Sequence, residues 1–448
     1  MSRFTCLMAT LVLAGAAGSA LGQELTPPAP PAAPPPATAP TPALPLAAPA
    51  PLATPAPSSA PSSALRPADT GVQVSTLAAP DAFTTPGRST GLPPTLWRGT
   101  SLKTAGTVLP LLATKPLSPA AAALARRVLA TGAPGPTGVG EDAALTAARA
   151  SALMAQGDPK GAAAILSRAP GIDRNPDLAH AAAESALLAG DDARACAVSD
   201  SLSAGRDEIY WLRLRAYCQA VAGHADQAQL TFELAQTQQR DVVYGRLMGV
   251  KIAGSGNPGA ASLRNGLDYA LSRSLGLDLS MAKASPAVAA ALAAAEPEEP
   301  TFDATAAQAD VAGLVDALTK GQPVDDALIS ALLATAGATD PKVRARGQAA
   351  ALLAFALSGP LTIDTRGQIA ALTLPEGKAP VGRDLALDSA TEHKLMGESA
   401  LLALWTSAEA GPAGPALGDR VRIVRALHAA GLETDARDFA LEGLLALK

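Results

Sequence analysis

The chain contains few of the residues that carry enzyme chemistry. Its 448 residues include four His and three Cys. The sequence has no His-Glu-x-x-His zinc motif, no Gly-x-Ser-x-Gly nucleophile turn and no Gly-x4-Gly-Lys phosphate loop. The histidines are isolated from one another and from any Cys at metal-ligand spacing. We therefore expect no catalytic residue, no cofactor and no metal site, and we expect that the protein is not an enzyme.

Aromatic residues, excess positive charge and long apolar runs are also scarce. Six Phe, four Tyr and three Trp stand against 105 Ala. This composition argues against an all-β protein, because strands favour aromatic and β-branched residues, and it favours closely packed helices. The net charge of −5 argues against nucleic acid as a partner. No run after the N-terminus reaches the roughly 18 apolar residues of a membrane span.

The N-terminus has the pattern of a secretory signal peptide over residues 1–22. Arg3 supplies a positive charge, an apolar run follows from Phe4 to Ala17, and Ala20-Leu21-Gly22 is a suitable cleavage site before Gln23. The alternative is an uncleaved anchor. The pattern predicts a bacterial protein that is periplasmic or secreted.

A Pro/Ala-rich segment follows the predicted signal peptide. Sixteen prolines lie between Pro27 and Pro67. Proline fixes φ and lacks a backbone donor, so we expect a polyproline II coil here. We predict that residues 23–117 as a whole form a disordered tether. The residues leave open whether this tether is a spacer or a passive leader.

A glycine recurs every 33 residues in the part of the chain that follows. The glycines are Gly157, Gly190, Gly223 and Gly256. Each is followed five residues later by alanine and preceded seven residues earlier by Ala or Gly. A glycine can end a helix in the left-handed conformation, and small residues allow two helices to cross closely. The spacing therefore predicts helical hairpins, with the small residues at their crossings: Ala150, Ala162, Ala183, Ala195, Ala216, Ala228, Gly249 and Ala261.

These stretches resemble tetratricopeptide repeats, as in Leu-Leu-Ala-Gly190-x4-Ala195 and Ala-Val-Ala-Gly223-x4-Ala228-x3-Phe232. The resemblance covers about residues 141–275. It implies an all-α fold in which antiparallel helical hairpins stack as an α-solenoid. It also implies a groove lined by residues of the first helices, where Tyr and Arg are typical binding residues. The candidates for partner binding are then His180, Glu184, Tyr210, Arg213, Tyr217 and Arg246.

The whole chain divides into four predicted parts. The signal peptide (1–22) and tether (23–117) precede the repeats (118–295) and a C-terminal helical domain (296–448), which begins at a Glu/Pro-rich break. Within the C-terminal domain we expect a long loop at 358–387 and a final hairpin around Gly431. Apolar spacing predicts helices over 120–130, 285–295, 303–320, 324–336, 341–357, 389–410, 420–430 and 434–447.

Two cysteines remain after signal cleavage, Cys196 and Cys218. The repeat register places them on neighbouring antiparallel helices. Two interpretations stay open: a disulfide formed in an oxidising compartment, or two buried free thiols that pack as small apolar groups.

The sequence as a whole predicts a non-enzymatic exported scaffold. It would present a helical groove to another envelope protein or to a peptide segment of one. Two alternatives remain: an accessory or degenerate relative of a cell-wall enzyme such as a soluble lytic transglycosylase, or a structural envelope protein that assembles with itself.

Overall fold

The computed structural model describes residues 81–140, 142–293, 300–373 and 376–447. The predicted signal peptide, the predicted tether as far as residue 80 and the predicted boundary at 296 lie outside these residues. Those described belong to one compact unit, Ser75–Lys448.

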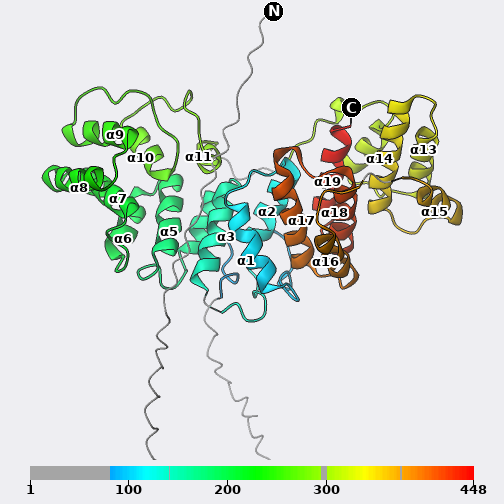
Figure 1. The fold of residues 1–448 in the computed structure, drawn as a ribbon, viewed down its shortest axis with the longest axis horizontal. Coiled ribbons are helices and arrows are strands. Elements are labelled where there is room, and N and C mark those ends of the chain that lie inside the picture. Colours follow the sequence, from blue (N-terminus) through cyan, green and yellow to red (C-terminus); the bar gives the residue numbers. More distant parts are fainter. Residues whose placement is uncertain (1–80, 141, 294–299, 374–375, 448) are drawn as a thin grey trace, which may run out of the picture. The chain divides into compact units, whose positions relative to one another are not determined.

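The described chain is all-α, as the sequence predicts, and no β-strand occurs among the described residues (Figure 1). The only strand-like feature there is a single bridge between Leu263 and Ala284. The helices are α1 Leu102–Leu112, α2 Pro119–Ala130, α3 Ala143–Ala155, α4 Pro159–Leu166, α5 Pro176–Ala189, α6 Asp192–Ser201, α7 Ile209–Val221, α8 Ala225–Gln238, α9 Val242–Ala253, α10 Gly266–Ser274, α11 Pro286–Leu292, α12 Ala312–Thr319, α13 Asp326–Ala336, α14 Pro341–Leu357, α15 Ile363–Ala370, α16 Val381–Glu392, α17 Met396–Ala410, α18 Leu417–Ala429 and α19 Glu433–Leu445.

Three hairpins follow the 33-residue spacing: α3 with α4, α5 with α6, and α7 with α8. The turn glycines Gly157, Gly190 and Gly223 have φ values of +93°, +82° and +80°. This left-handed region favours glycine because it has no Cβ. In these three hairpins the alanines expected at the helix crossings are completely buried: Ala150, Ala162, Ala183, Ala195, Ala216 and Ala228. Gly249 and Ala261, expected at a fourth crossing, are only partly buried.

The turn at Gly190 shows how one dipeptide both ends and begins a helix. The Asp191 N–H donates to the Ala186 carbonyl at 2.8 Å, which closes the C-terminus of α5. The Asp191 carboxylate then accepts from the Arg194 N–H at 3.0 Å and caps α6. The connection is so short that α6 must turn back along α5.

The C-terminal hairpin of α18 and α19 has the same turn. Gly431 has φ +82°, and the Leu432 N–H donates to the Leu427 carbonyl at 2.9 Å. Ala436, five residues after the glycine, is completely buried.

The fourth hairpin expected around Gly256 does not form, so that prediction was wrong. Helix α9 ends at Ala253, with Gly254 as its C-cap, and no helix follows until α10 begins at Gly266. Gly254, Gly256 and Gly259 have φ values of +66°, +121° and +64°, which no right-handed helix can contain. Helix α10 instead packs against α5 and α9.

The prediction of disorder was wrong for residues 81–117. Phe83, Leu96 and Trp97 are completely buried, and the rings of Phe83 and Trp97 lie 4.8 Å apart. Helix α1 forms despite Pro110 within it. The segment folds because its few large apolar side chains find a core elsewhere in the chain.

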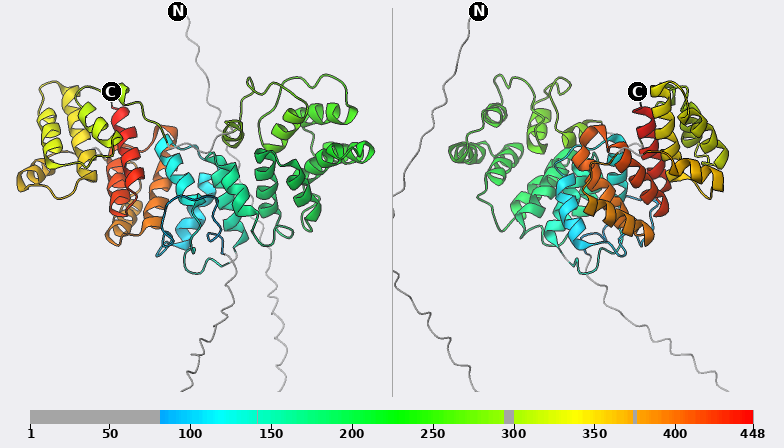
Figure 2. Two further views of the ribbon diagram at one scale, coloured as in Figure 1. Left: turned by 180° about the vertical axis from the view of Figure 1, so that it is seen from behind. Right: turned by 45° about the vertical axis from the view of Figure 1, so that its right-hand side comes forward.

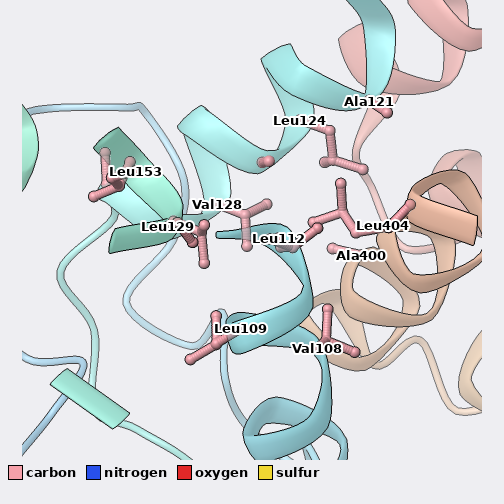
Figure 3. Close-up of a cluster of buried hydrophobic side chains, with 14 of the residues drawn as sticks. Val108, Leu109, Leu112, Ala121, Leu124, Val128, Leu129, Leu153, Ala400 and Leu404 are labelled. Carbon is pink, nitrogen blue, oxygen red and sulfur yellow. The ribbon is translucent and has the colours of Figure 1, made fainter. Parts of the chain in front are cut away.

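That core is completed by the C-terminal helices. Helix α1 packs against α17, and α2 packs against both α17 and α19, so the cyan and orange helices lie side by side in both views of Figure 2. In Figure 3, Val108 and Leu112 of α1 and Leu124 of α2 meet Ala400 and Leu404 of α17. All five side chains are completely buried. Helix contacts therefore join residues on both sides of the predicted boundary at 296.

Glutamates of the C-terminal helices cap the N-termini of α1 and α2. Glu398 accepts from the Ser101 N–H at 2.8 Å and from the Thr104 hydroxyl at 2.9 Å. Glu442 accepts from the Ala120 N–H at 2.9 Å. Each carboxylate supplies an acceptor and a negative charge at the positive end of a helix dipole.

Arg149 of α3 is a buried cation that ties together three parts of the backbone. Its guanidinium donates to the carbonyls of Leu129, Ala82 and Thr131 at 2.8, 3.0 and 2.9 Å. It also lies over the Phe83 ring, 5.7 Å from the centroid. Burial lowers the pKa of the guanidinium to about 9, an effect that the charge of Asp81 partly offsets.

Two other boundaries differ from the prediction. The expected loop at 358–387 contains α15 and the start of α16. The helix expected over 389–410 is broken between Glu392 and Met396, where Lys394 adopts φ +53°. Leu395 turns the chain there, so α16 and α17 pack against each other as separate helices.

None of the described helices is long and apolar enough to span a membrane.

Two glycine-to-alanine substitutions should change stability in opposite directions, one at a turn and one inside a helix. Gly223→Ala should lower the free energy of unfolding by about 1 kcal/mol. The added methyl group would meet no neighbouring atom, so the whole effect comes from the left-handed backbone, with φ at +80°. Gly249→Ala is the control: Gly249 lies inside α9 with open space around it, so Ala should raise stability by up to about 1 kcal/mol. Chemical denaturation of both variants checks the difference, and equal effects would contradict the assignment of the turn.

Candidate functional site

Cys196 of α6 and Cys218 of α7 form a disulfide in the structure, with their Cα atoms 5.5 Å apart. The repeat register predicts that these two positions are neighbours. The bond joins the second hairpin to the third across a separation of 22 residues.

His180, Glu184 and Tyr210, three of the residues predicted to bind a partner, form one cluster. The rings of His180 and Tyr210 lie 4.1 Å apart, edge to face. The Tyr210 hydroxyl donates to one Glu184 oxygen at 2.9 Å, and the other oxygen accepts from the Gly266 N–H at 2.7 Å. Glu184 therefore caps α10. Burial, together with the Glu184 carboxylate, raises the pKa of Tyr210, so that it remains a neutral donor.

Arg213 belongs to a second cluster, centred on Asp241. Its guanidinium lies 3.5 Å from the Asp241 carboxylate and over the Tyr244 ring, 5.4 Å from the centroid. Arg264, from the segment before α10, donates to Asp241 at 3.0 Å and also contacts Asp268. Asp241 in turn accepts from the Val243 and Tyr244 N–H groups and caps α9.

Tyr217 and Arg246 also contribute to holding α10 and the segment before it in place. The completely buried Tyr217 donates to Asp192 at 3.0 Å, and Asp192 pairs with Arg273 of α10 at 2.6 Å. Arg246 donates to the Ala260 carbonyl at 2.6 Å.

The six predicted residues thus make contacts within the chain. Three of them form one cluster, and Arg213, Tyr217 and Arg246 each make separate contacts. Their polar atoms bind α10 and the segment before it to α5, α7 and α9. Of the six, His180 is exposed and Tyr217 is completely buried. A contact of these residues with a partner stays a prediction.

A different part of the chain offers a cleft, with a volume of about 720 Å³. It lies among α14, α15, α16 and α18 and the stretch after α15. This volume is within the range of ligand-binding clefts. Its apolar lining comes from Leu352, Phe355, Ala356, Ile369, Ala370, Leu372 and Val421.

Charges of both signs surround the cleft. Asp388 and Glu392 of α16 and Arg425 of α18 are exposed and make no hydrogen bond or ion pair with any described residue. Arg422 pairs with Asp384. An apolar floor between unpaired charges suits a segment with one apolar face and polar flanks.

No family model, curated protein or solved structure matches the chain. Within the described ranges, no three His, Cys, Asp or Glu side chains are grouped to hold a metal ion.

The sequence pattern does not reveal the cleft, in part because the segment that supplies Ile369, Ala370 and Leu372 of its lining is predicted to be a loop. Residues 358–387 contain Gly359-Pro360 and Pro380, which predict turns, and α15 is short. The usable signal was Ile369 and Leu372, an apolar pair at helical spacing within that segment.

The disulfide gives a stability prediction. Replacement of both cysteines, as Cys196→Ala with Cys218→Ala, should lower the free energy of unfolding by about 3 kcal/mol, because the unfolded chain is no longer cross-linked. Denaturation with and without reductant measures this: the wild type should lose stability on reduction and the double variant should not. Full alkylation of the wild type without reductant would contradict the bond.

Asp241 gives a prediction for acid conditions. Desolvation opposes its ionisation, but the hydrogen bond from Tyr244 and the charges of Arg264 and Arg213 outweigh it, so the pKa of Asp241 is lowered. A lowered folded pKa means that the stabilisation is complete above the unfolded pKa of about 3.9 and is lost as the pH falls through the folded value. Asp241→Asn should remove that part of the pH dependence. Urea denaturation of both proteins between pH 2.5 and 6 checks it, and parallel curves would contradict it.

Proposed function

We propose that the protein is an exported, non-enzymatic helical scaffold that binds a segment of another envelope protein. The observation that carries the proposal is the cleft among α14, α15, α16 and α18, with its apolar floor and unpaired charges. We infer that its occupant is an amphipathic segment that places apolar side chains on Phe355 and Leu372. Charged groups of the segment would then meet Asp388, Glu392 and Arg425.

Two further features support this function. The Cys196–Cys218 disulfide suits an oxidising compartment outside the cytoplasm, in agreement with the predicted signal peptide. The three hairpins with αL glycine turns support the likeness to tetratricopeptide repeats, which present binding surfaces on stacked helices. The predicted groove of that family belongs to the first helices, whereas our proposal places the partner at the C-terminal cleft.

Photo-crosslinking in cells tests the proposal. A photoreactive residue at position 372, in the cleft, should give a discrete adduct with an envelope protein. The same residue at position 363, which is 79% exposed and lies outside the cleft lining, should give none.

A pair of matched substitutions gives the size of the effect. Leu372→Glu should reduce partner binding about tenfold, because it places a charge on the apolar floor. Val381→Glu, at an exposed apolar residue outside the cleft lining, should leave binding unchanged. Two results would overturn the proposal. One is equal crosslinking from positions 372 and 363, and the other is the release of soluble fragments from cell wall by the purified protein.

A further inference from the structure

The rim of the cleft carries more acidic than basic side chains. Three exposed carboxylates belong to its lining: Glu376, in the stretch after α15, and Asp388 and Glu392 of α16. None of the three makes a hydrogen bond or ion pair with any described residue. Among the described lining residues, Arg425 is the one cation without a partner, because Arg422 already belongs to an ion pair. A pairing of Arg425 with one carboxylate would still leave two of them without a counter-charge.

Glu376 lies at the end of the cleft where α18 begins. The N–H groups of Lys378 and Ala379 donate to the Asp419 carboxylate at 2.7 and 3.3 Å. Asp419 lies in the first turn of α18, and α16 begins two residues after Ala379. The two helices therefore begin side by side, and Glu376 is two residues from the contact that joins them.

The other two carboxylates lie toward the opposite end of the cleft. Asp384 of α16 pairs with Arg422 of α18 about one turn beyond this shared start, so the two helices run in the same direction. Asp388 and Glu392 lie a further four and eight residues along α16, about 6 and 12 Å at 1.5 Å per residue. Negative charge therefore stands at both ends of the apolar floor.

A segment that suits this rim has positive charge on both sides of its apolar residues. Lys and Arg fit such a site, because their methylene groups can lie on apolar surface while the charged group reaches the rim. The Pro/Ala-rich segment of this chain does not fit, since residues 25–65 contain no charged side chain. The charges therefore favour a segment of another protein over this part of the chain itself.

We propose that the segment bound in the cleft is cationic and amphipathic, with Lys or Arg at both ends of an apolar stretch. This inference rests on the proposed function, and it adds the sign and the position of the charges that the partner brings. Helix α16, which forms one wall, has 12 residues and is about 18 Å long. A helical segment of three to four turns would reach from one acidic end of the cleft to the other.

Mapping of the adduct formed in cells at position 372 tests the inference on the natural partner. Mass spectrometry of the digested adduct should place the crosslink in a partner segment of net positive charge, with Lys or Arg on both sides of the attached residue. A crosslink in an acidic or uncharged segment would overturn the cationic occupant and leave the proposed function in place. Absence of any adduct would overturn the proposed function, and this inference with it.

Three synthetic peptides test the sign of the charge on the purified full chain. Each has about 14 residues, roughly four helical turns, with the same pattern of leucines and with Lys, Gln or Glu at every other position. In fluorescence anisotropy at low salt, the Lys peptide should bind about tenfold more tightly than the Gln peptide, and the Glu peptide more weakly than either. Equal affinities of the Lys and Gln peptides would overturn the inference.

Neutral variants show whether the rim of the cleft is responsible. Asp388→Asn with Glu392→Gln should lower the affinity for the Lys peptide about three- to tenfold and leave that for the Gln peptide unchanged. The matched control, Asp226→Asn with Glu233→Gln, removes two negative charges from α8 and should leave both affinities unchanged. All four side chains are exposed, and circular dichroism checks that the fold is retained. Equal losses in the two variants would mean that the peptide responds to the net charge of the protein, which would also overturn the inference.

Discussion

The buried guanidinium of Arg149 is the contact on which the N-terminal part of the fold depends. It donates to three carbonyls that no helix satisfies: one before α1, and two at the end of α2. A buried cation is costly unless its hydrogen bonds are complete, and here three carbonyls and the Phe83 ring surround it. The segment before α1, the end of α2 and the first hairpin can therefore hold only one arrangement relative to one another.

Much of the fold follows from local sequence. The αL glycines and the buried alanines at the crossings recur with a fixed spacing, so the sequence predicts three hairpins, and the same glycine-to-alanine spacing predicts the final one. The same reasoning failed at Gly256, because the spacing ignores Gly254 and Gly259, whose left-handed conformations prevent a second helix. It also failed at residues 81–117, where proline content suggested disorder but Phe83 and Trp97 supply buried anchors.

The contacts that arrange the hairpins could not be predicted from the sequence. Glu184, Glu398 and Glu442 each cap a helix far away in the chain, and a glutamate within a helix has no local pattern that identifies its partner. The residues chosen as a binding face were real neighbours, since Tyr210 meets His180 and Glu184. The sequence does not show that α10 packs back against these residues. Their polar atoms bond to α10 and to the segment before it, and so are not free for a partner. The cleft likewise depends on tertiary packing, because its lining comes from four helices and only part of it from the predicted loop at 358–387.

The pairing of α1 and α2 with α17 and α19 has a consequence for the order of folding. Each hairpin closes through contacts only a few residues apart, so it can form as soon as its own residues are available. The two N-terminal helices cannot: their apolar faces and their N-terminal N–H groups are completed by residues near the other end of the chain. In a chain that emerges N-terminus first, from a ribosome or a translocation channel, α3 can pack early against α1 and α2, but the faces of α1 and α2 that meet α17 and α19 stay uncovered until those helices are made. The first two helices of the described residues are thus among the last to complete their native contacts.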